Sequence, residues 1–239
     1  MRRFSRTHRL SFTDQKREHE KIRKVFLLVF ALIVFYLLFV NFFFSMRVLE
    51  NSSMNPGLSE GDRFVFFSFT IYNVFPNLPV FDEIPLKRGN IVLVDFTEHR
   101  SVMRKIASSL LRFFTLGRIP IEKERIFIKR VIALPGDEVS ITNFVARVRP
   151  ASDPYTYTEY ECADKLYYNN IPENDAFWDE SVPFSGNMSP IRLKEGEYFV
   201  LADDRSNTND SRTWGPVSTA NIAGKALLRF WPSAKFGVP

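Results

Sequence analysis

The stretch IFIKRVIALPGD, residues 126–137, indicates the kind of fold that this chain adopts. Its apolar run, 126–133, is short enough for a strand, and it ends at Pro135-Gly136, a turn pair in which Pro fixes φ and Gly tolerates a positive φ. Five further short runs bounded by turn signals also read as strands: 63–67, 90–95, 138–142, 197–202 and 226–231. Such spacing predicts an antiparallel, mainly β domain.

Two adjacent cations within this strand are informative. Because side chains alternate along a strand, Lys129 shares a face with Phe127 and Val131, whereas Arg130 lies on the other face. Neither face is cleanly polar, so we expect at least one cation to lie among apolar groups. Desolvation there would lower the pKa of a lysine and free its amine to act as a base. An edge strand with both cations directed to solvent is the equally supported alternative.

A long apolar run precedes this domain. Residues 25–46 are 22 residues without a charge, and a helix of that length measures about 33 Å, enough to cross a hydrocarbon core of about 30 Å. It is too long for a cleaved signal peptide, and no small-x-small site follows it. The run therefore predicts one transmembrane helix.

The basic character of the chain belongs to the tail before this run. Residues 1–24 hold nine of the 32 Lys/Arg and three of the 27 Asp/Glu, which leaves 23 basic and 24 acidic residues after position 24. The positive-inside tendency places the tail in the cytoplasm and residues 47–239 on the other side of the membrane. The balanced remainder gives no support to nucleic-acid binding.

Histidine and cysteine are scarce. His8, His19 and His99 are far apart, and Cys162 is the single cysteine. We therefore expect neither a metal site nor an intrachain disulfide.

Two segments interrupt the strand pattern. Residues 101–116, SVMRKIASSLLRFFTL, have apolar residues at helical spacing and form a predicted amphipathic basic helix, within an insertion of about 101–118. That helix either packs on the domain or lies on a membrane surface. Residues 145–195 are rich in Pro and Tyr, and we expect them to be the irregular part of a second subdomain of about 140–196.

Four short blocks carry the candidate chemistry: 51–58 (NSSMNPGL), 87–95 (KRGNIVLVD), 127–137 (FIKRVIALPGD) and 202–215 (ADDRSNTNDSRTWG). The last is dense in turn formers and alternating charges, which suits a hydrophilic loop or an active-site wall. His99 lies outside all four. A serine protease built from these blocks would therefore use a Ser-Lys pair rather than a Ser-His-Asp triad.

In this order, behind an N-terminal anchor, the blocks resemble bacterial type I signal peptidases over most of the chain, as far as Trp231-Pro232. The resemblance implies a signal-peptidase/LexA-like antiparallel β-sheet catalytic domain that needs no cofactor. It implies an endopeptidase of the bacterial cytoplasmic membrane, in contact with the lipid bilayer. The expected substrates are exported preproteins, cleaved after small residues in the Ala-x-Ala manner.

The resemblance also implies roles for individual residues. By position, Ser53 matches the nucleophile, Lys129 matches the general base, and Thr208 fills the place of the hydroxyl residue that orients the lysine. The oxyanion hole would use the Ser53 backbone N–H, and we expect the Asn51 side-chain amide to donate as well. Two ion pairs are implied to support the site: Arg130 with Asp203, and Asp210 with Arg212.

Some positions depart from the family pattern. Gly57 stands where threonine is usual, and Ala202, Asp204 and Ser206 differ from the usual Gly-Asp-Asn-Arg-Asp opening of the last block. Substrate preference therefore stays open, as does the role of Cys162. If the enzyme reading is correct, the aromatic run 64–75, FVFFSFTIYNVF, is expected to rest on the membrane.

Two other functions compete with this one. A non-catalytic, membrane-anchored binding domain on the same fold is disfavoured because Ser53, Lys129 and Thr208 are all present. A self-cleaving or dedicated Ser/Lys peptidase that acts on one partner is a third possibility, which the sequence does not exclude.

Overall fold

The computed structural model describes residues 12–69, 86–97, 125–172 and 186–239. The chain divides into two units, Met1–Asn41 and Phe42–Pro239. Helix α1 (Phe12–Phe43) starts well before the expected span of 25–46 and ends three residues before its end, because residues 44–46 join a strand. Within the part of the chain that is described, no helix combines the length and the apolarity needed to cross a membrane.

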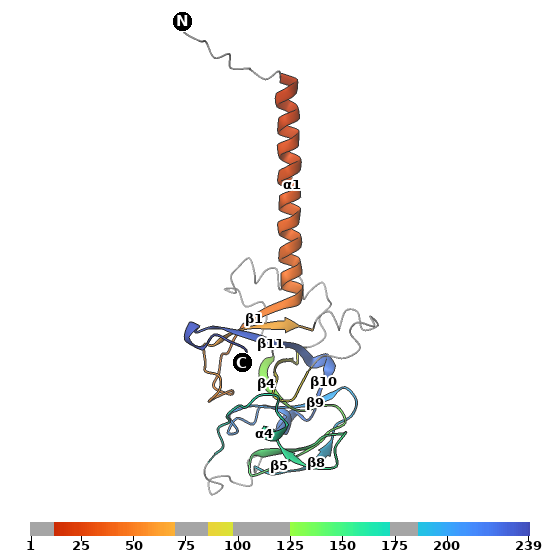
Figure 1. Cartoon of the computed structure of the whole chain (residues 1–239), viewed down its shortest axis with the longest axis vertical. Helices are drawn as coiled ribbons and strands as arrows, with labels where there is room; N and C mark the ends of the chain where they lie inside the picture. Colours follow the sequence, from red (N-terminus) through yellow and green to blue (C-terminus); the bar gives the residue numbers. More distant parts are fainter. Residues whose placement is uncertain (1–11, 70–85, 98–124, 173–185) are drawn as a thin grey trace. The chain divides into compact units, whose positions relative to one another are not determined.

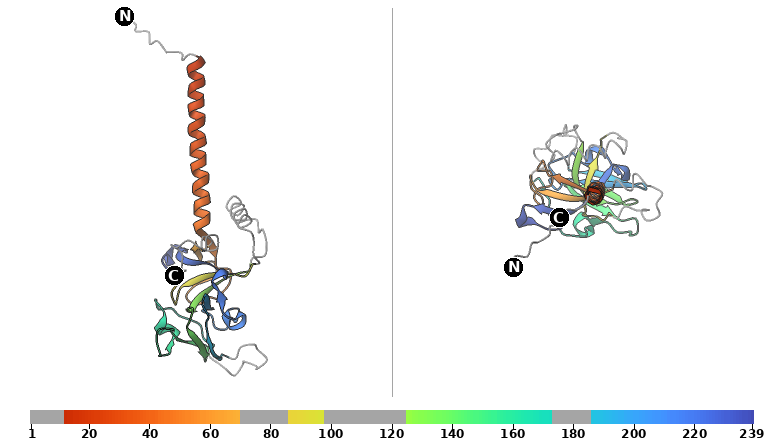
Figure 2. Two further views of the ribbon diagram at one scale, coloured as in Figure 1. Left: turned by 90° about the vertical axis from the view of Figure 1, so that its right-hand side faces the viewer. Right: turned by 90° about the horizontal axis from the view of Figure 1, so that it is seen from above.

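The larger sheet of the second unit is fully antiparallel and contains all the predicted strands except 138–142. Its strands are visible from three directions in Figures 1 and 2. In spatial order they are β1 (Phe44–Val48), β2 (Arg63–Ser68), β11 (Ile222–Trp231), β3 (Ile91–Asp95), β4 (Ile126–Ala133), β9 (Glu197–Leu201) and β10 (Val217–Ser218).

A second antiparallel sheet begins in the chain just after the Pro135-Gly136 turn. In order, it contains β7 (Tyr157–Thr158), β6 (Val145–Arg149), β5 (Glu138–Thr142) and β8 (Met188–Arg192). Figure 1 shows β5 and β8 side by side, close to the short helix α4 (Glu159–Cys162). The mainly β class is therefore confirmed.

The prediction that the second subdomain is irregular over residues 145–195 was wrong for 145–149, 157–162 and 188–192, which form three strands and a short helix. Asn143 and Phe144 both adopt positive φ, 51° and 63°, and this tight turn pairs β5 with β6. In β6 the apolar Ala146 and Val148 alternate with arginines, so one face is buried. Pro190 is accommodated because β8 is an edge strand.

Three hydrophobic cores pack against these sheets. Strand β3 separates two of them, because Val92 and Val94 face one core while Ile91 and Leu93 face the other. The third core lies between the smaller sheet and the end of β4 and includes Ile132 and Tyr167. Short helices complete the unit: α5 (Ser211–Trp214), η3 (Thr219–Asn221) and η4 (Ser233–Lys235).

The aromatic run 64–75 is described only as far as residue 69. Phe64 and Phe66 are buried on the face of β2 that packs into one core, and Phe69, just after β2, is buried in another. The expectation that the run rests on a membrane was therefore wrong for these three phenylalanines, whereas Phe67 is half-buried. The rest of the run and the insertion at 101–118 lie outside the described residues.

Candidate active site

Strand β4 brings two buried cations into the domain. Lys129 and Arg130 are 2% and 5% exposed, and they pair across the ladder with Val92 and Ile91. The expectation of a cation among apolar groups is confirmed, and the alternative in which both reach solvent is wrong. The apolar residues on either side of both cations make this strand favourable to bury in spite of its charges.

The environment of Lys129 makes its amine a base. Burial is the largest effect on this residue and lowers its pKa from 10.5 to about 8. The neighbouring charges act in both directions: Asp210, Asp203 and Asp204 raise the pKa, while Arg212 lowers it. About half of this lysine is therefore neutral near pH 8, and about a tenth at pH 7, so that its amine is able to accept a proton.

Ser53 lies on a loop that is fixed from both sides. Met54 and Leu58 are buried in one of the cores and anchor the loop. Turn hydrogen bonds join Asn55 N–H to the Ser52 carbonyl at 2.9 Å and Leu58 N–H to the Met54 carbonyl at 2.9 Å. Ser53 itself is 2% exposed. The sequence therefore places this hydroxyl on a packed turn rather than on a solvated linker.

The backbone N–H of Ser53 already has a partner within its own loop. It donates to Oδ1 of the exposed Asn51 at 3.1 Å. The Asn51 side chain thus presents its oxygen, rather than its amide N–H, to the group expected to bind the oxyanion. Use of either donor by a substrate requires this side chain to turn away from the Ser53 N–H.

The loop after β9 connects the two catalytic candidates. Asp204 N–H donates to the Ser53 carbonyl at 3.0 Å, and the Asp203 carboxylate binds Arg130 at 2.8 and 2.5 Å. The same two aspartates act on the Lys129 pKa. A Cβ at Gly57 would lie 3.7 Å from Asp203 Oδ2, so the Ser53 loop passes directly over this ion pair.

A second ion pair shapes the far end of that loop. Asp210 and Arg212 are joined at 2.8 Å with both side chains buried. Asp210 also accepts from Ala202 N–H at 2.9 Å and caps α5, while Arg212 donates to the Arg205 carbonyl at 2.9 Å. Thr208 is half-buried between these contacts, and its carbonyl accepts from Asp210 N–H at 2.8 Å. The loop therefore has a defined shape.

Residues 87–89, Lys-Arg-Gly at the start of the second block, are linked to the turn after β4. Arg88 binds Asp137 at 2.7 Å, and Asp137 also accepts from Leu134 N–H at 2.8 Å. This contact holds the start of β3 against the end of β4, the strand that carries Lys129.

Sequence reasoning missed a further buried charged group, formed by Glu159, Arg205 and Tyr167. Arg205 and Glu159 are joined by an ion pair that is inaccessible to solvent, and the Tyr167 hydroxyl donates to Glu159 at 2.6 Å. The available signal was Arg205, a charged residue between two turn formers in the last block. Its partners lie in a segment read as irregular.

Metal ligands do not gather in this region. Over residues 12–69, 86–97, 125–172 and 186–239, no group of three or more His, Cys, Asp or Glu side chains is placed to hold an ion.

Comparison with known proteins adds to this geometry. The description "Signal peptidase, peptidase S26" belongs to the family model that matches residues 22–231, most of the chain. The chain belongs to the signal peptidase family, peptidase S26. It is an enzyme, a hydrolase of the signal peptidase I type, and the family processes signal peptides.

Relatives in this family come from bacteria and plants. The chain is 28% identical to a probable signal peptidase I-1 of Synechocystis over 80% of its own length and 73% of that protein. It is 26% identical to signal peptidase I of Bacillus licheniformis, over 84% of its own length and 83% of that protein. It is also 26% identical to thylakoidal processing peptidase 1 of Arabidopsis thaliana, but there it spans only 42% of the relative's length.

Proposed function

We propose that this chain is a membrane-anchored serine endopeptidase in which Ser53 is the nucleophile and Lys129 the general base. One observation carries the proposal. Lys129 is a buried lysine with a pKa lowered to about 8, and it lies beside the Asp203–Asp204 segment that also holds the Ser53 loop. A buried, partly neutral amine and a fixed serine, linked here through the Asp203–Asp204 segment, are two of the parts that a Ser-Lys mechanism requires.

The first half of the reaction acylates the enzyme. The neutral Lys129 amine removes the Ser53 hydroxyl proton as the oxygen attacks the carbonyl carbon of the scissile bond. The negative charge of the tetrahedral intermediate is then stabilised by backbone and side-chain donors near Ser53. Collapse of the intermediate breaks the C–N bond, and Lys129 passes its proton to the departing amine of the mature protein.

The second half regenerates the enzyme. A water molecule attacks the ester carbonyl on Ser53 while Lys129 removes one of its protons. The ester bond breaks, the proton returns to the Ser53 oxygen, and the signal peptide leaves with a new carboxylate. Thr208 is proposed to orient the Lys129 amine through its hydroxyl. The fixed loop formed by the Asp210–Arg212 pair supports this role.

Substrates are proposed to be exported preproteins with small residues before the cleavage site, in the Ala-x-Ala manner. The substrate would bind as an extended strand along a sheet edge, since backbone hydrogen bonds then align the scissile bond. Small side chains fit shallow pockets beside Ser53, whereas large ones would keep the carbonyl away from it.

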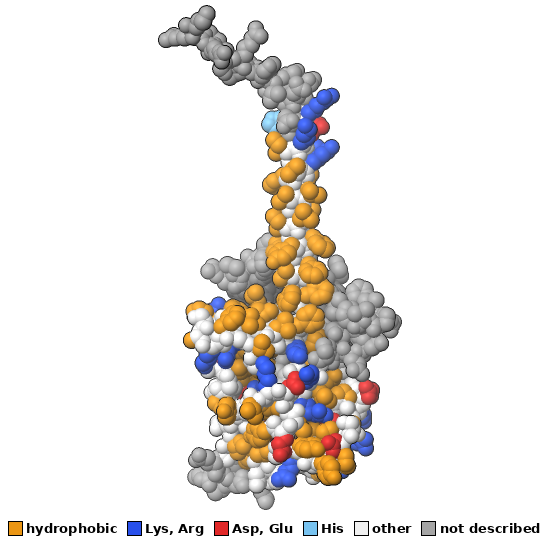
Figure 3. Space-filling model, in the orientation of Figure 1, with side chains coloured by type: hydrophobic (Ala, Val, Ile, Leu, Met, Phe, Trp, Pro, Cys, Tyr) orange, Lys and Arg blue, Asp and Glu red, His pale blue; other side chains and the backbone are white. Residues whose placement is uncertain are grey.

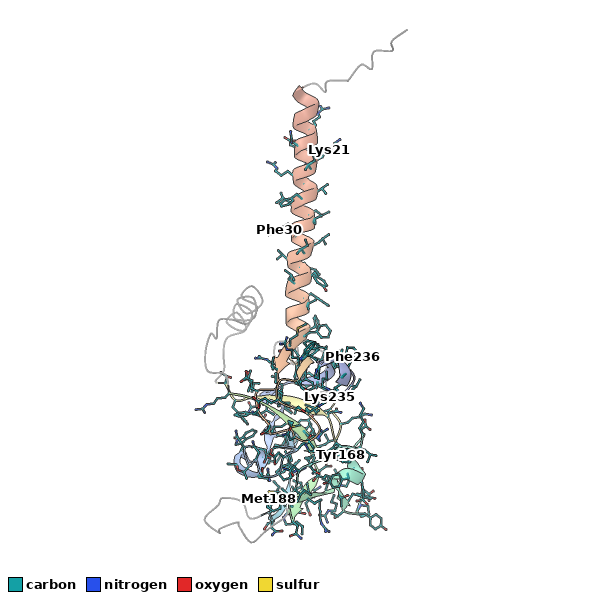
Figure 4. The ribbon with its side chains drawn as sticks, turned by 90° about the vertical axis from the view of Figure 1, so that its left-hand side faces the viewer. Lys21, Phe30, Tyr168, Met188, Lys235 and Phe236 are labelled. Carbon is teal, nitrogen blue, oxygen red and sulfur yellow. The ribbon has the colours of Figure 1, made fainter. Side chains whose placement is uncertain are left out.

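Membrane anchoring is proposed for the helical part of the uncharged run 25–46, which is residues 25–43. Large apolar side chains are exposed along α1 from Val25 to Phe39 and are visible on the face drawn in Figure 3, with basic residues towards the start of the helix. Figure 4 shows Lys21 and Phe30 projecting from this helix. Exposed apolar surface of this extent favours a lipid environment. The basic tail supports a cytoplasmic N-terminus.

The deciding experiment is cleavage of a fluorogenic Ala-x-Ala signal-peptide substrate in detergent by the wild type, Ser53→Ala and Lys129→Ala. We expect cleavage by the wild type and loss in both variants. A peptide with bulky residues in place of both alanines is the matched control and should remain uncleaved. No cleavage by a folded wild-type protein would favour a dedicated substrate or a non-catalytic role instead.

Anchoring needs its own test. Full-length protein expressed in bacteria should remain in the membrane fraction after alkaline carbonate extraction. Replacement of Phe30 and Phe35 by arginine should release it. Release of the unmodified chain would overturn this part of the proposal without affecting the catalytic part.

A further inference from the structure

A short part of the second subdomain lies between the two halves of the proposed active site. We call residues 167–170 the bridging segment. Asn169 forms a bridge with Pro56 of the Ser53 loop, and Asn170 forms one with Asp204. Asn170 N–H donates to the Asp203 carbonyl at 2.9 Å, and Arg205 N–H donates to the Asn170 carbonyl at 2.8 Å. The segment thus touches both elements that must be held against Lys129.

Within this segment, Tyr167 is directed into the protein. Its ring packs against the Arg130 guanidinium, with 4.1 Å from Arg130 Cζ to the ring centroid. It is 9% exposed, whereas the adjacent Tyr168, labelled in Figure 4, is 76% exposed. Arg130 is held by Asp203 at two atoms and by the Gly89 carbonyl at 2.8 Å. The tyrosine ring therefore covers a face of a cation whose edges are already bound.

Tyr167 is itself held in place by Glu159. This buried carboxylate has four donors. Oε1 accepts from Ala146 N–H at 3.0 Å and from Asn169 Nδ2 at 3.3 Å, while Oε2 accepts from the Tyr167 hydroxyl and from Arg205. One carboxylate thus connects β6, the bridging segment and the loop after β9. The carboxylate is satisfied by these four donors and restrains the groups that it joins, although Nε and Nη1 of the buried Arg205 have no hydrogen-bond partner among the described residues.

We infer that Tyr167, oriented by Glu159, is a positioning residue for catalysis. Its ring keeps water from the Arg130–Asp203 pair and so fixes the Asp203–Asp204 segment, to which Ser53 is bonded, relative to Lys129. The inference rests on the proposed function of Ser53 and Lys129. The second subdomain is then part of the catalytic apparatus, although none of the reacting groups lies in it.

The pH profile should change when the ring is removed. Water then reaches the Arg130–Asp203 pair and loosens the Asp203–Asp204 segment, whose charges act on Lys129 from the other side of the strand. Part of the desolvation that lowers the Lys129 pKa is thereby relieved. The variant keeps all four charged residues that act on the Lys129 pKa: Asp210, Arg212, Asp203 and Asp204. The Lys129 pKa should therefore rise, and the acid limb of the kcat profile should move to higher pH. A tyrosine with only a packing role would lower stability and leave that limb in place.

The test compares Tyr167→Met and Tyr167→Phe with the wild type and with Tyr157→Phe, all as full-length protein in detergent. Tyr157 is the matched control because its hydroxyl donates to Asp153 at 2.8 Å within the same subdomain, and Tyr157 lies in β7. Thermal unfolding establishes that each variant is folded. Cleavage of the fluorogenic signal peptide gives kcat, KM and the pH profile.

We expect Tyr167→Met to lower kcat at least tenfold, to change KM less than twofold, and to move the acid limb upward. Tyr167→Phe, which keeps the ring but loses the bond to Glu159, should lower kcat about threefold with a smaller shift. Tyr157→Phe should match the wild type. An unchanged kcat in both Tyr167 variants, or a lower kcat with an unmoved acid limb, would overturn the inference. If Tyr167→Met does not fold, Tyr167→Phe decides on the same criteria.

A measurement without substrate separates this inference from the proposed function. NMR titration of the Lys129 amine after lysine-selective isotope labelling, assigned by comparison with Lys129→Met, gives the pKa directly. Lack of cleavage by the wild type would refute the proposed function, whereas an unchanged Lys129 pKa in Tyr167→Met would refute the inference alone.

Discussion

The two faces of strand β4 bury a cation in opposite ways. On one face, Lys129 lies with Phe127 and Val131 against an apolar core, and burial is the dominant effect on its pKa. On the other face, Arg130 has a bidentate carboxylate, a carbonyl and an aromatic ring around its guanidinium. The two residues are adjacent in sequence and almost equally buried, so the difference arises from their partners.

This contrast shows how one strand can supply both a reactive and a structural charge. A lysine pKa shifts readily on burial, whereas a guanidinium remains charged and accepts a planar partner at fixed angles. The Arg130–Asp203 pair can therefore hold a loop in place, while Lys129 can exchange a proton during each reaction cycle. Substitutions that remove or alter one side of this contrast at a time should therefore have distinct effects.

The largest effect is expected for Lys129→Met. Loss of the proposed general base should lower kcat by about 10⁴-fold or more, as removal of one residue does in other serine protease active sites. The same change should stabilise the fold at neutral pH. A pKa moved from 10.5 to about 8 corresponds to a cost of about 3 kcal/mol, at about 1.4 kcal/mol per unit. The measurements are steady-state cleavage and denaturant unfolding.

The sign of the pH dependence provides the control for this prediction. Because the folded pKa is below the unfolded one, the cost of burying Lys129 is fully present below about pH 8 and disappears as the pH rises towards 10.5. The stability gained in Lys129→Met should shrink over that window, and wild-type kcat/KM should rise through about pH 8. A stability difference independent of pH would show that the lysine is not the titrating group.

Next in size is Asp203→Asn, which leaves the Arg130 charge buried without its counter-ion. Breaking such a pair costs about 3–5 kcal/mol, so the free energy of unfolding should fall by this amount. The double variant Arg130→Met/Asp203→Leu should recover most of the loss, because no unpaired charge remains. A single variant within about 1 kcal/mol of the wild type would mean that water reaches Arg130, contrary to its 5% exposure.

The sequence was a good guide to β4 and a poor one to its surroundings. The predicted strand at 126–133 matches Ile126–Ala133, because a short apolar run that ends at Pro-Gly carries its own boundary. The same pattern showed that Lys129 and Arg130 lie on opposite faces. The strand pattern alone could not show which cation would be paired, since Asp203 lies 73 residues away, and only the family resemblance implied the Arg130–Asp203 pair. Such pairing depends on the tertiary fold.

The second subdomain was misread for a related reason. Its strands are short, their turn uses positive φ at a phenylalanine, and one strand contains a proline, so local signals for regular structure are weak. The Glu159–Arg205 ion pair joins residues that are 46 positions apart in the sequence. Glu159 lies in a segment without a clear hydrophobic pattern, and Arg205 lies in a segment that was read as a loop. Likewise, the spacing of phenylalanines in β2 did not reveal which of them the neighbouring strands would cover.

A moderate effect is expected at Asn51, where two roles compete. If its amide turns to donate to the oxyanion, Asn51→Ala should lower kcat by about 100-fold, and Asn51→Ser, which retains a donor, should keep most of the activity. Asn51→Asp should be worse than Asn51→Ala, because a carboxylate repels the oxyanion and binds the Ser53 N–H more strongly. An unchanged kcat in Asn51→Ala would exclude this residue from the oxyanion hole and leave it as a local cap on Ser53.

The smallest effect is expected for Gly57→Ala, next to the Arg130–Asp203 pair. A Cβ there would lie 3.7 Å from Asp203 and 4.0 Å from Arg130 and from the Met54 carbonyl, which is ordinary contact, and the backbone at this glycine is not left-handed. The substitution should therefore add about 0.4–1 kcal/mol of stability by restricting the unfolded chain. Gly215→Ala is the contrasting control, since its φ of 77° penalises any side chain. Equal effects at both positions would mean that the Ser53 loop is not held over the ion pair as described.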